Sequence, residues 1–282
     1  MQKRIYNKEP LNKLIVVNKP MFMSSNSYLN RIKRKYKNKK AGFSGTLDPF
    51  AKGCLIVAFG QYSKLFQFFQ KTPKTYRAVI WLGVVSDSLD IENVVSVNEE
   101  NRLNIEDIKK ELKSLEKEIE YYPPKFSAKK IDGERAYNLA REGKDVEMKK
   151  SVMKIFDTNF ISYNHPFITF EASVSEGSYI RSLAQILLER LNRVGTLSYL
   201  NRLNEGKFFY ENEKDLNPLD YLEMEEISYS GDKSYFEQGK KILIEYLDKN
   251  EDGKYLVKFD DFFSIIEIEK KEVKYILNRI MI

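Results

Sequence analysis

The sequence predicts an α/β (mixed α+β) fold with one large domain and a small second one. Apolar residues make up 42% of the 282 residues, which is enough for a sizeable core. Apolar side chains alternate along residues 76–84, which is typical of a half-buried strand. From Ile105 to Ile119 they recur at a spacing of three and four residues, which indicates an amphipathic helix with one buried stripe.

The first elements follow from local signals. The apolar run 14–17 predicts a short buried strand, and Asn18-Lys19-Pro20 ends it. Ser24 or Ser25 is placed to cap a helix that runs through the basic stretch after it. The two glycines and the proline of residues 41–49 predict a loop, and residues 54–59 predict the next strand.

The later elements alternate in type. Asn104 is placed to cap the 105–119 helix, and strands are expected around 152–163 and 167–174. Ser178 is placed to cap a further helix, whose apolar residues point inward. Residues 255–259 and 262–268 predict strands of a small terminal module.

Charge is unevenly distributed along the chain, whose formal net charge is +6. Residues 1–50 hold 12 Lys or Arg and 2 Asp or Glu, whereas residues 211–282 hold 11 and 18. Seven of the ten residues 31–40 are cationic. A polyanion would be attracted to the N-terminal part and repelled by the tail. By itself the basic stretch fits either a nucleic-acid contact or a solvated face.

Two residue counts limit the chemistry. With only Cys54 and only His165, the chain cannot form an intrachain disulfide, a multi-cysteine zinc site or a two-histidine metal site. His165 precedes Pro166 and reads as a turn residue. Neither a P-loop nor a G-x-G-x-x-G motif occurs, so a nucleotide cofactor has little support. Any catalysis must therefore depend on carboxylate, Lys, Arg or Tyr side chains.

The chain shows no sign of a membrane span. Its longest clean apolar run, residues 54–59, is far shorter than the ~20 residues that cross a bilayer. Residues 1–9 contain no apolar stretch typical of a signal peptide. We therefore expect a soluble, cytoplasmic protein.

Asp48 is the carboxylate that the local sequence singles out. It lies in Gly45-Thr46-Leu47-Asp48-Pro49, where the proline keeps Asp48 out of a helix and in a rigid bend. The preceding glycines let a ligand approach the backbone closely. The segment alone fits either an ordinary Asx turn or a ligand site.

Five motifs in order resemble the tRNA pseudouridine synthase B (TruB) family. The most specific is Lys40-Ala41-Gly42-Phe43-Ser44-Gly45-Thr46-Leu47-Asp48-Pro49, followed by Ala51-Lys52-Gly53. The others are Asn18-Lys19-Pro20 with Met23-Ser24-Ser25, Lys74-Thr75-Tyr76-Arg77, the insertion from Pro123 with Gly133, Arg135, Tyr137, Ala140, Arg141 and Gly143, and finally Gly177–Leu183 with Tyr199–Leu203. The resemblance covers roughly residues 11–210.

The resemblance implies a pseudouridine synthase fold with a mixed, largely antiparallel central sheet and a cleft floored by Asp48. It divides the chain into a catalytic domain, 1–230, with a basic RNA-gripping thumb at about 121–151, and a shortened, β-rich PUA-like module, 231–282. The match of the module is loose, and this part of the chain is acidic.

The implied activity is isomerisation of the T-loop uridine of tRNA (uridine-55) to pseudouridine. The C1′–N1 bond breaks, the uracil turns and a C1′–C5 bond forms, with no redox change, metal or cofactor. The base must first be flipped out of the folded loop. The implied partner is the T arm of tRNA, with no membrane and no obligatory protein partner, and we expect a monomer.

The resemblance also implies roles for individual residues. Asp48 matches the essential aspartate, which acts as nucleophile or base, and Arg181 matches the arginine that pairs with it. Tyr76 matches the aromatic that stacks on the target base, and Lys19, Tyr179 and Leu200 match pocket-lining positions. Phe43 stands where the family usually has His, so it keeps a stacking face and loses a hydrogen bond. Without the resemblance, Arg181 reads as a solvated cation and Tyr76 and Leu200 as core residues.

Two related functions remain as alternatives. One is a tRNA-folding chaperone of the same fold, against which the intact set of Asp48, Tyr76 and Arg181 argues. The other is a guide-RNA-dependent pseudouridine synthase, which needs partner proteins; the long insertion favours an enzyme that acts alone. An RNA methyltransferase lacks support because no glycine-rich cofactor loop is present.

Overall fold

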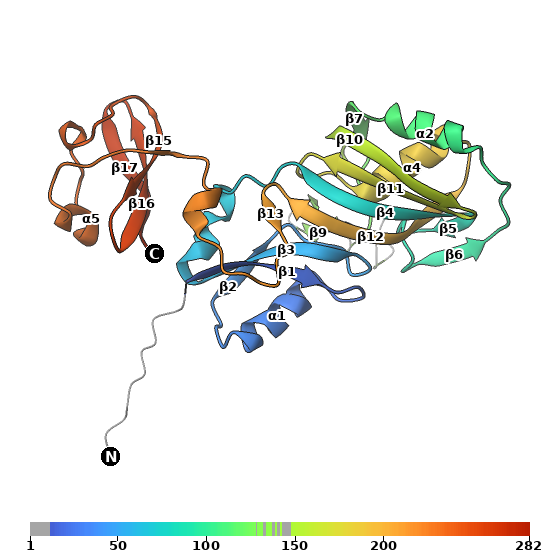
Figure 1. Cartoon of the computed structure of the whole chain (residues 1–282), viewed down its shortest axis with the longest axis horizontal. Helices are drawn as coiled ribbons and strands as arrows, with labels where there is room; N and C mark the ends of the chain where they lie inside the picture. Colours follow the sequence, from blue (N-terminus) through green and yellow to red (C-terminus); the bar gives the residue numbers. More distant parts are fainter. Residues whose placement is uncertain (1–11, 128, 132–133, 137–138, 140–141, 143–147) are drawn as a thin grey trace, which may run out of the picture.

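The computed structural model describes residues 12–127, 129–131, 134–136, 139, 142 and 148–282, and within them the molecule is elongated (Figure 1). A small sheet lies at one end, and a larger sheet with helices on its faces fills the middle and the other end. In the predicted thumb, Gly133, Tyr137, Ala140, Arg141 and Gly143 lie outside the described residues.

In the described part of the chain the large sheet has nine strands and is mixed but largely antiparallel, as predicted. Its parallel pair joins β3 to β12 through Asn201↔Lys52 and Arg202↔Gly53. The strands pair in the order β1 (Lys13–Lys19), β3 (Lys52–Phe59), β12 (Gly195–Glu205), β4 (Lys74–Leu82), β11 (Phe167–Val174), β10 (Ser151–Asn164) and β7 (Glu118–Tyr121), with β2 (Ala41–Ser44) on β3 and β13 (Phe208–Phe209) on β12.

Strands β1 and β3 are covered on both faces, which explains why residues 14–17 form a continuous apolar run. Ile15 and Val17 pack against Leu29 and Ile32 of α1 (Ser25–Lys35). The alternate side chains of β1 pack on the other face with η1 (Gly60–Gln67). Helix α1 is capped by Ser24, whose hydroxyl accepts a hydrogen bond from the Ser27 amide, as its sequence predicts.

Helices α2 (Ile105–Lys113) and α4 (Ile180–Arg190) cover one face of the sheet beyond β12. Their inward residues join strand residues in the largest apolar core. The predicted cap of α2 is confirmed, because the Asn104 side chain accepts from the Glu106 amide. This core reaches the segment after β2, where Leu47 and Phe50 are buried on either side of Asp48.

The small sheet at the C-terminal end consists of β14 (Glu225–Glu226), β15 (Gly253–Lys258), β16 (Phe262–Glu269) and β17 (Glu272–Met281) among the described residues. It confirms the expected β-rich, PUA-like module. One of its faces packs with α5 (Ser234–Gln238) and η3 (Ile244–Tyr246). Phe263 and Ile265 of β16 share a core with Leu14 and Val16 of β1, so the small sheet is packed onto the part of the molecule that contains the large sheet.

The remaining described elements are short. They are the ribbon of β5 (Val84–Ser86) and β6 (Val94–Val97), the pair of β8 (Lys130–Ile131) and β9 (Glu134–Arg135), and η2 (Pro218–Tyr221). Because β14 already belongs to the small sheet, the domain division at residue 230 stays a prediction.

Three local predictions are wrong. Residues 41–44 form strand β2 rather than a loop. Strand β12 pairs only with the start of β3, and β2 supplies hydrogen-bond partners to the backbone along the rest of that edge of β3, from Ile56 onward. The 105–119 helix ends at Lys113, and Ile119 lies in β7. Helix α4 begins at Ile180 with Tyr179 at its N-cap and no side-chain cap, so Ser178 does not cap it.

In the part of the chain that the structure describes, no helix is both long and apolar enough to cross a membrane. The same residues contain no group of three or more His, Cys, Asp or Glu side chains arranged to hold a metal ion.

Candidate active site

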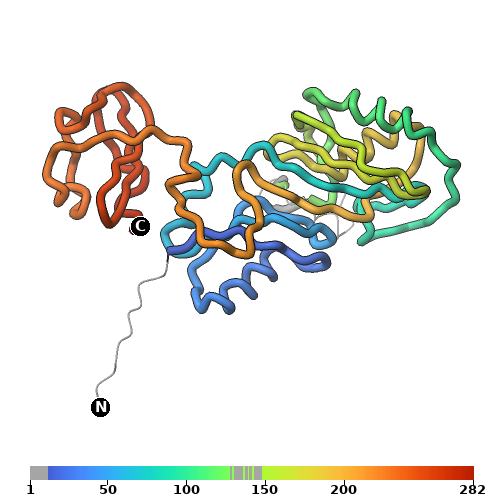
Figure 2. Tube along the Cα trace, in the orientation of Figure 1, coloured from blue at the N-terminus to red at the C-terminus, as the bar shows by residue number. Residues whose placement is uncertain are grey.

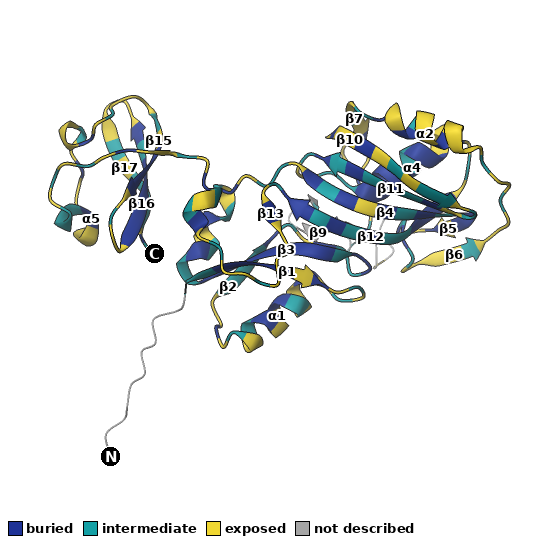
Figure 3. Cartoon of the chain, in the orientation of Figure 1, coloured by how far each residue is buried: buried dark blue, intermediate teal, exposed yellow. Residues whose placement is uncertain are grey.

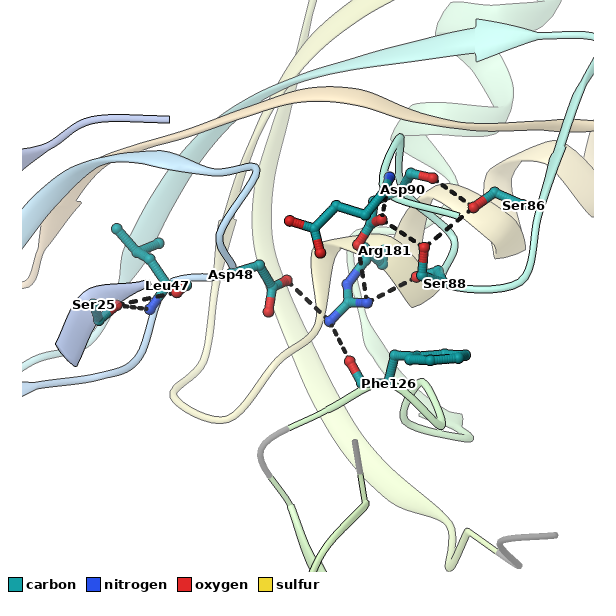
Figure 4. A network of polar contacts seen from close by, with 9 residues as sticks. Ser25, Leu47, Asp48, Ser86, Ser88, Asp90, Phe126 and Arg181 are labelled. Carbon is teal, nitrogen blue, oxygen red and sulfur yellow. Dashed lines mark hydrogen bonds and ion pairs between the residues drawn. The ribbon is translucent and has the colours of Figure 1, made fainter. Parts of the chain in front are cut away.

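The turn that carries Asp48 is fixed at several points. The Ser25 hydroxyl lies 2.9 Å from the Leu47 amide and 3.0 Å from the Leu47 carbonyl, so it bonds both polar groups of that residue (Figure 4). The Ala51 amide donates to the Asp48 carbonyl at 3.1 Å and closes the turn. These bonds hold the backbone of Asp48 against α1 and the start of β3.

Lys19 holds the same turn from the side of β1. Its buried ammonium donates to the carbonyls of Pro20 at 2.9 Å, Met23 at 2.6 Å and Pro49 at 3.3 Å. Burial lowers the pKa of Lys19 to about 8, and the negative charge of Asp48 opposes this shift. All three N–H groups of this ammonium are thus directed at backbone carbonyls of the two adjacent turns.

A buried ion cluster lies under Gly45, the glycine three residues before Asp48. Glu205 is fully buried and pairs with Arg202 at 2.8 Å and with Lys74 at 3.0 Å. Arg202 also donates to the Gly45 carbonyl at 2.9 Å. Gly45 has φ +64°, and a Cβ there would lie 2.9 Å from the Glu205 carboxylate, so only glycine fits without a shift.

Arg181 joins two carboxylates that are far apart in the sequence (Figure 4). Its guanidinium lies 3.0 Å from Asp48 and 3.2 Å from Asp90, and its side chain is only 3% exposed. It also donates to the carbonyls of Ser88 at 2.7 Å and Phe126 at 2.8 Å. Arg181 is therefore not the solvated cation that the local sequence alone suggests, and the Asp48–Arg181 pair that the resemblance implies is present.

Asp90 is itself held in place. One of its carboxylate oxygens accepts from the Ser88 hydroxyl at 2.6 Å and from the Glu92 amide at 2.9 Å. The other oxygen faces Arg181. A fixed anion on the far side of the guanidinium therefore orients Arg181 toward Asp48.

The charge state of Asp48 reflects opposing influences. Burial raises the pKa of the Asp48 carboxyl, and the negative charge of Asp90 raises it further. The positive charges of Arg181 and Lys19 oppose that rise. The side chain is nonetheless 30% exposed, so the carboxylate can be reached from outside.

Asp48 opens onto a cavity of about 320 Å³, which is within the usual size range of ligand sites. The cavity brings together five of the seven residues predicted to form the site. Its described lining comprises residues 45–48, Lys74, Tyr76, Lys129, residues 176–181, Leu200 and Arg202.

Tyr76 and Tyr179 supply aromatic surface to this cavity. Tyr76 lies on β4 directly opposite Arg202 of β12, and it is buried. Tyr179 precedes α4 and contacts the Tyr121 ring, and burial raises the pKa of its phenol. The cavity therefore pairs a carboxyl group with two rings, an arrangement suited to an aromatic ligand.

The other two predicted residues are placed elsewhere. Lys19 is not among the described lining residues; it lies behind the turn and bonds its backbone. Phe43 lies on β2 opposite Val57, half-buried, and packs against the apolar cluster under α1. Their predicted roles in substrate binding stay predictions.

Two important residues escaped the sequence reasoning. Leu200, Arg202 and Asn204 share the buried face of β12, so the two-residue period of a strand could have placed Arg202 beside Leu200. Asp90 gives no comparable signal. It lies in an irregular segment between β5 and β6, and only tertiary structure brings it to Arg181.

The basic stretch is largely accessible. Arg31, Arg34, Lys37, Lys39 and Lys40 are exposed on and after α1, which Figure 3 shows as mostly exposed or intermediate. Lys35 pairs with Glu213 at 2.6 Å, so part of this charge is neutralised within the chain.

Sequence comparison places the chain among known proteins. The profile of the TruB family pseudouridylate synthase (N terminal domain) matches residues 33–180. The chain is 54% identical over 270 residues to the tRNA pseudouridine synthase B of Sulfurovum sp. (strain NBC37-1), which covers 96% of this chain and 98% of that protein. It is 47% identical over 270 residues to the protein of the same name from Campylobacter jejuni (strain RM1221), at 96% and 99% coverage.

Structural comparison agrees on the fold. A chain of a Cbf5-Nop10-Gar1 complex superposes with a TM-score of 0.65 at 16% identity, over 96% of this chain and 84% of that one. A chain of an H/ACA RNP bound to a substrate RNA containing 2′-deoxyuridine gives a TM-score of 0.63 at 16% identity, over 96% and 85%.

Proposed function

The chain belongs to the TruB family of pseudouridylate synthases, and on that premise we propose that it isomerises the T-loop uridine of tRNA, uridine-55, to pseudouridine, with Asp48 as the catalytic carboxylate. The observation that carries the proposal is the Asp48 carboxylate, which faces a cavity of about 320 Å³ and pairs with Arg181 at 3.0 Å.

The proposed reaction rearranges atoms without adding or removing any. The C1′–N1 bond breaks, the uracil turns, and a C1′–C5 bond forms; the proton leaves C5 and N1 gains one. Asp48 acts as nucleophile or base in this sequence, for which it must be ionised. The Arg181 guanidinium favours that ionised form and fixes the direction of the carboxylate.

The rings of the cavity are assigned to the base. Tyr76 is proposed to stack on the flipped uracil, an interaction worth about 1–3 kcal/mol. Tyr179 and Leu200 would close the other sides of the pocket. Lys19 and Arg202 contribute indirectly, because they hold the backbone that carries Asp48.

The remaining interactions are assigned to the tRNA backbone. The exposed cations on and after α1 would hold phosphates of the T arm.

The proposal also covers the protein as a whole. We propose that it is a cytoplasmic monomer that needs no obligatory protein partner, with residues 1–230 as the catalytic domain and 231–282 as the module. Phe126, whose carbonyl binds Arg181, would connect the start of the thumb to the catalytic pair.

The test uses the purified chain alone and an unmodified T-arm hairpin of tRNA. We expect pseudouridine at the position of uridine-55, detected by nucleoside analysis after digestion. A second hairpin with the target uridine replaced by cytidine controls for modification elsewhere. Binding and refolding of the hairpin without any pseudouridine would support the chaperone function instead, and activity only with added guide RNA and proteins would support the guide-dependent one.

A further inference from the structure

The turn between β1 and α1 presents an aromatic side chain that belongs to no ring pair or apolar cluster of the described residues. Phe22 is 70% exposed, more than any other large apolar side chain in the described residues. It lies in the middle of the turn 20–24, next to the turn that carries Asp48. Burial in the core therefore does not account for this residue.

The backbone at Phe22 is also unfavourable for its side chain. Its φ is +60°, in the left-handed region that glycine adopts freely and that bulky residues rarely occupy. Among the described non-glycine residues with positive φ, Phe22 is the aromatic one. A glycine would relieve this strain and expose less apolar surface, so folding alone does not favour phenylalanine here.

The surrounding bonds hold the turn in this shape. Lys19 donates to the carbonyls on both sides of Phe22, those of Pro20 and Met23. The Met23 amide donates to the Pro49 carbonyl at 3.3 Å, one residue beyond Asp48. Lys19 at the end of β1 pairs with Gly53 at the start of β3. The turn that carries Phe22 and the turn that carries Asp48 therefore lie at the same end of these two strands, as the trace in Figure 2 shows.

We propose that Phe22 is a stacking platform for a base of the RNA substrate beside the turn that carries Asp48, and that Lys19 holds it in its left-handed conformation. The occupant is an unpaired nucleobase next to the target nucleotide, whose flat face the exposed ring can cover. The basic N-terminal part around the turn favours such a polyanion over an uncharged ligand. This inference rests on the proposed function.

Stacking makes three measurable predictions. In the Asp48→Asn background, where substrate is not consumed, Phe22→Leu and Phe22→Gly should weaken hairpin binding by about five- to thirtyfold, the lower part of the range for one stacked base. Phe22→Tyr should bind as the parent does. The slope of log Kd against log salt should stay unchanged, since these variants keep every cation that can neutralise a phosphate.

Stability separates stacking from a structural role. The melting temperature of Phe22→Gly should equal or exceed that of the parent, because the strain is relieved. Phe167→Leu is the matched control: this exposed ring contacts Trp81, five residues along β4 from Tyr76. It should leave binding unchanged.

The outcomes distinguish this inference from the function on which it rests. Absence of pseudouridine from wild-type reactions would overturn the proposed function. If the wild type is active, parental affinity in Phe22→Leu and Phe22→Gly would overturn the stacking role alone. It would also be overturned by equal losses in Phe22→Leu and Phe167→Leu, or by a fall in melting temperature that accompanies the loss of binding.

Discussion

Asp90→Asn separates two ways in which the second carboxylate can act on Asp48. Asp90 raises the pKa of Asp48 by its charge, but it also orients the guanidinium that stabilises the ionised form. The substitution keeps the shape of the side chain and removes its charge. The two effects therefore shift the acid limb of the pH–rate profile in opposite directions.

The structure allows the direct effect to be estimated. Both carboxylates lie within 3.2 Å of one guanidinium. Two like charges ~7 Å apart repel by roughly 2 kcal/mol at an effective dielectric constant of about 20. Since the Asp48 side chain is 30% exposed, solvent screening reduces this to about 1–2 kcal/mol, or roughly a five- to thirtyfold change in the ratio of ionised to protonated Asp48.

The assay is kcat for a saturating T-arm hairpin as a function of pH. We expect the acid limb of Asp90→Asn to move to lower pH, because the pKa of Asp48 falls when the neighbouring negative charge is removed. On the plateau, kcat should fall about tenfold or more, because Arg181 loses a charge-assisted hydrogen bond worth about 1.5–3 kcal/mol.

Asp87→Asn is the matched control, since Asp87 is exposed in the same segment and makes the same change of charge. Its profile should be that of the wild type. An acid limb of Asp90→Asn that stays in place or moves to higher pH would refute the reasoning. It would mean that Asp90 acts through the orientation of Arg181 alone.

Three further predictions concern Asp48, the basic stretch and Phe43. Asp48→Asn should abolish turnover while hairpin affinity stays within about tenfold, since binding is distributed over many cations; turnover above about one per cent of wild type would exclude Asp48 as the catalytic group. Neutralising four cations of the basic stretch, Lys33, Arg34, Lys37 and Lys40, should weaken hairpin binding. It should also lower the slope of log K against log salt by about 0.7–0.9 for each phosphate that is no longer neutralised. The same change at four exposed lysines of the module, Lys240, Lys241, Lys254 and Lys258, should affect both quantities less. Since Phe43 packs under α1, Phe43→Ala and Phe43→His should both lower the melting temperature; unchanged melting with a tenfold loss of kcat/KM in Phe43→Ala would instead indicate stacking on RNA.

Deleting residues 232–282 is a poor test of what the module contributes to RNA binding. Phe263, Ile265 and Ile280 of this segment share a core with Leu14 and Val16 of β1. Their removal would expose buried apolar surface of the large sheet, and loss of affinity would then follow from loss of stability. Charge neutralisation on the module avoids this difficulty.

The sequence by itself predicted the elements in which apolar residues recur at a regular spacing. The alternation of residues 76–84 and the spacing from Ile105 indicated β4 and α2, because strand and helix periods are local properties. Gly45 and Pro49 likewise indicated a rigid bend at Asp48. Glycine allows backbone angles that other residues rarely adopt, and proline restricts the backbone of the residue before it. The partnership of Asp48 with Arg181 came from the family resemblance and not from these patterns.

Only the tertiary structure decided which charges meet. Asp48, Asp90 and Arg181 come from three distant segments, and the burial of Arg181 depends on both carboxylates being present. Residues 41–44 became a strand because β3 had an open edge there, which no local signal reveals. A buried charge is stable only beside its partners, and because those partners approach through folding, the sequence near each residue carries no record of them.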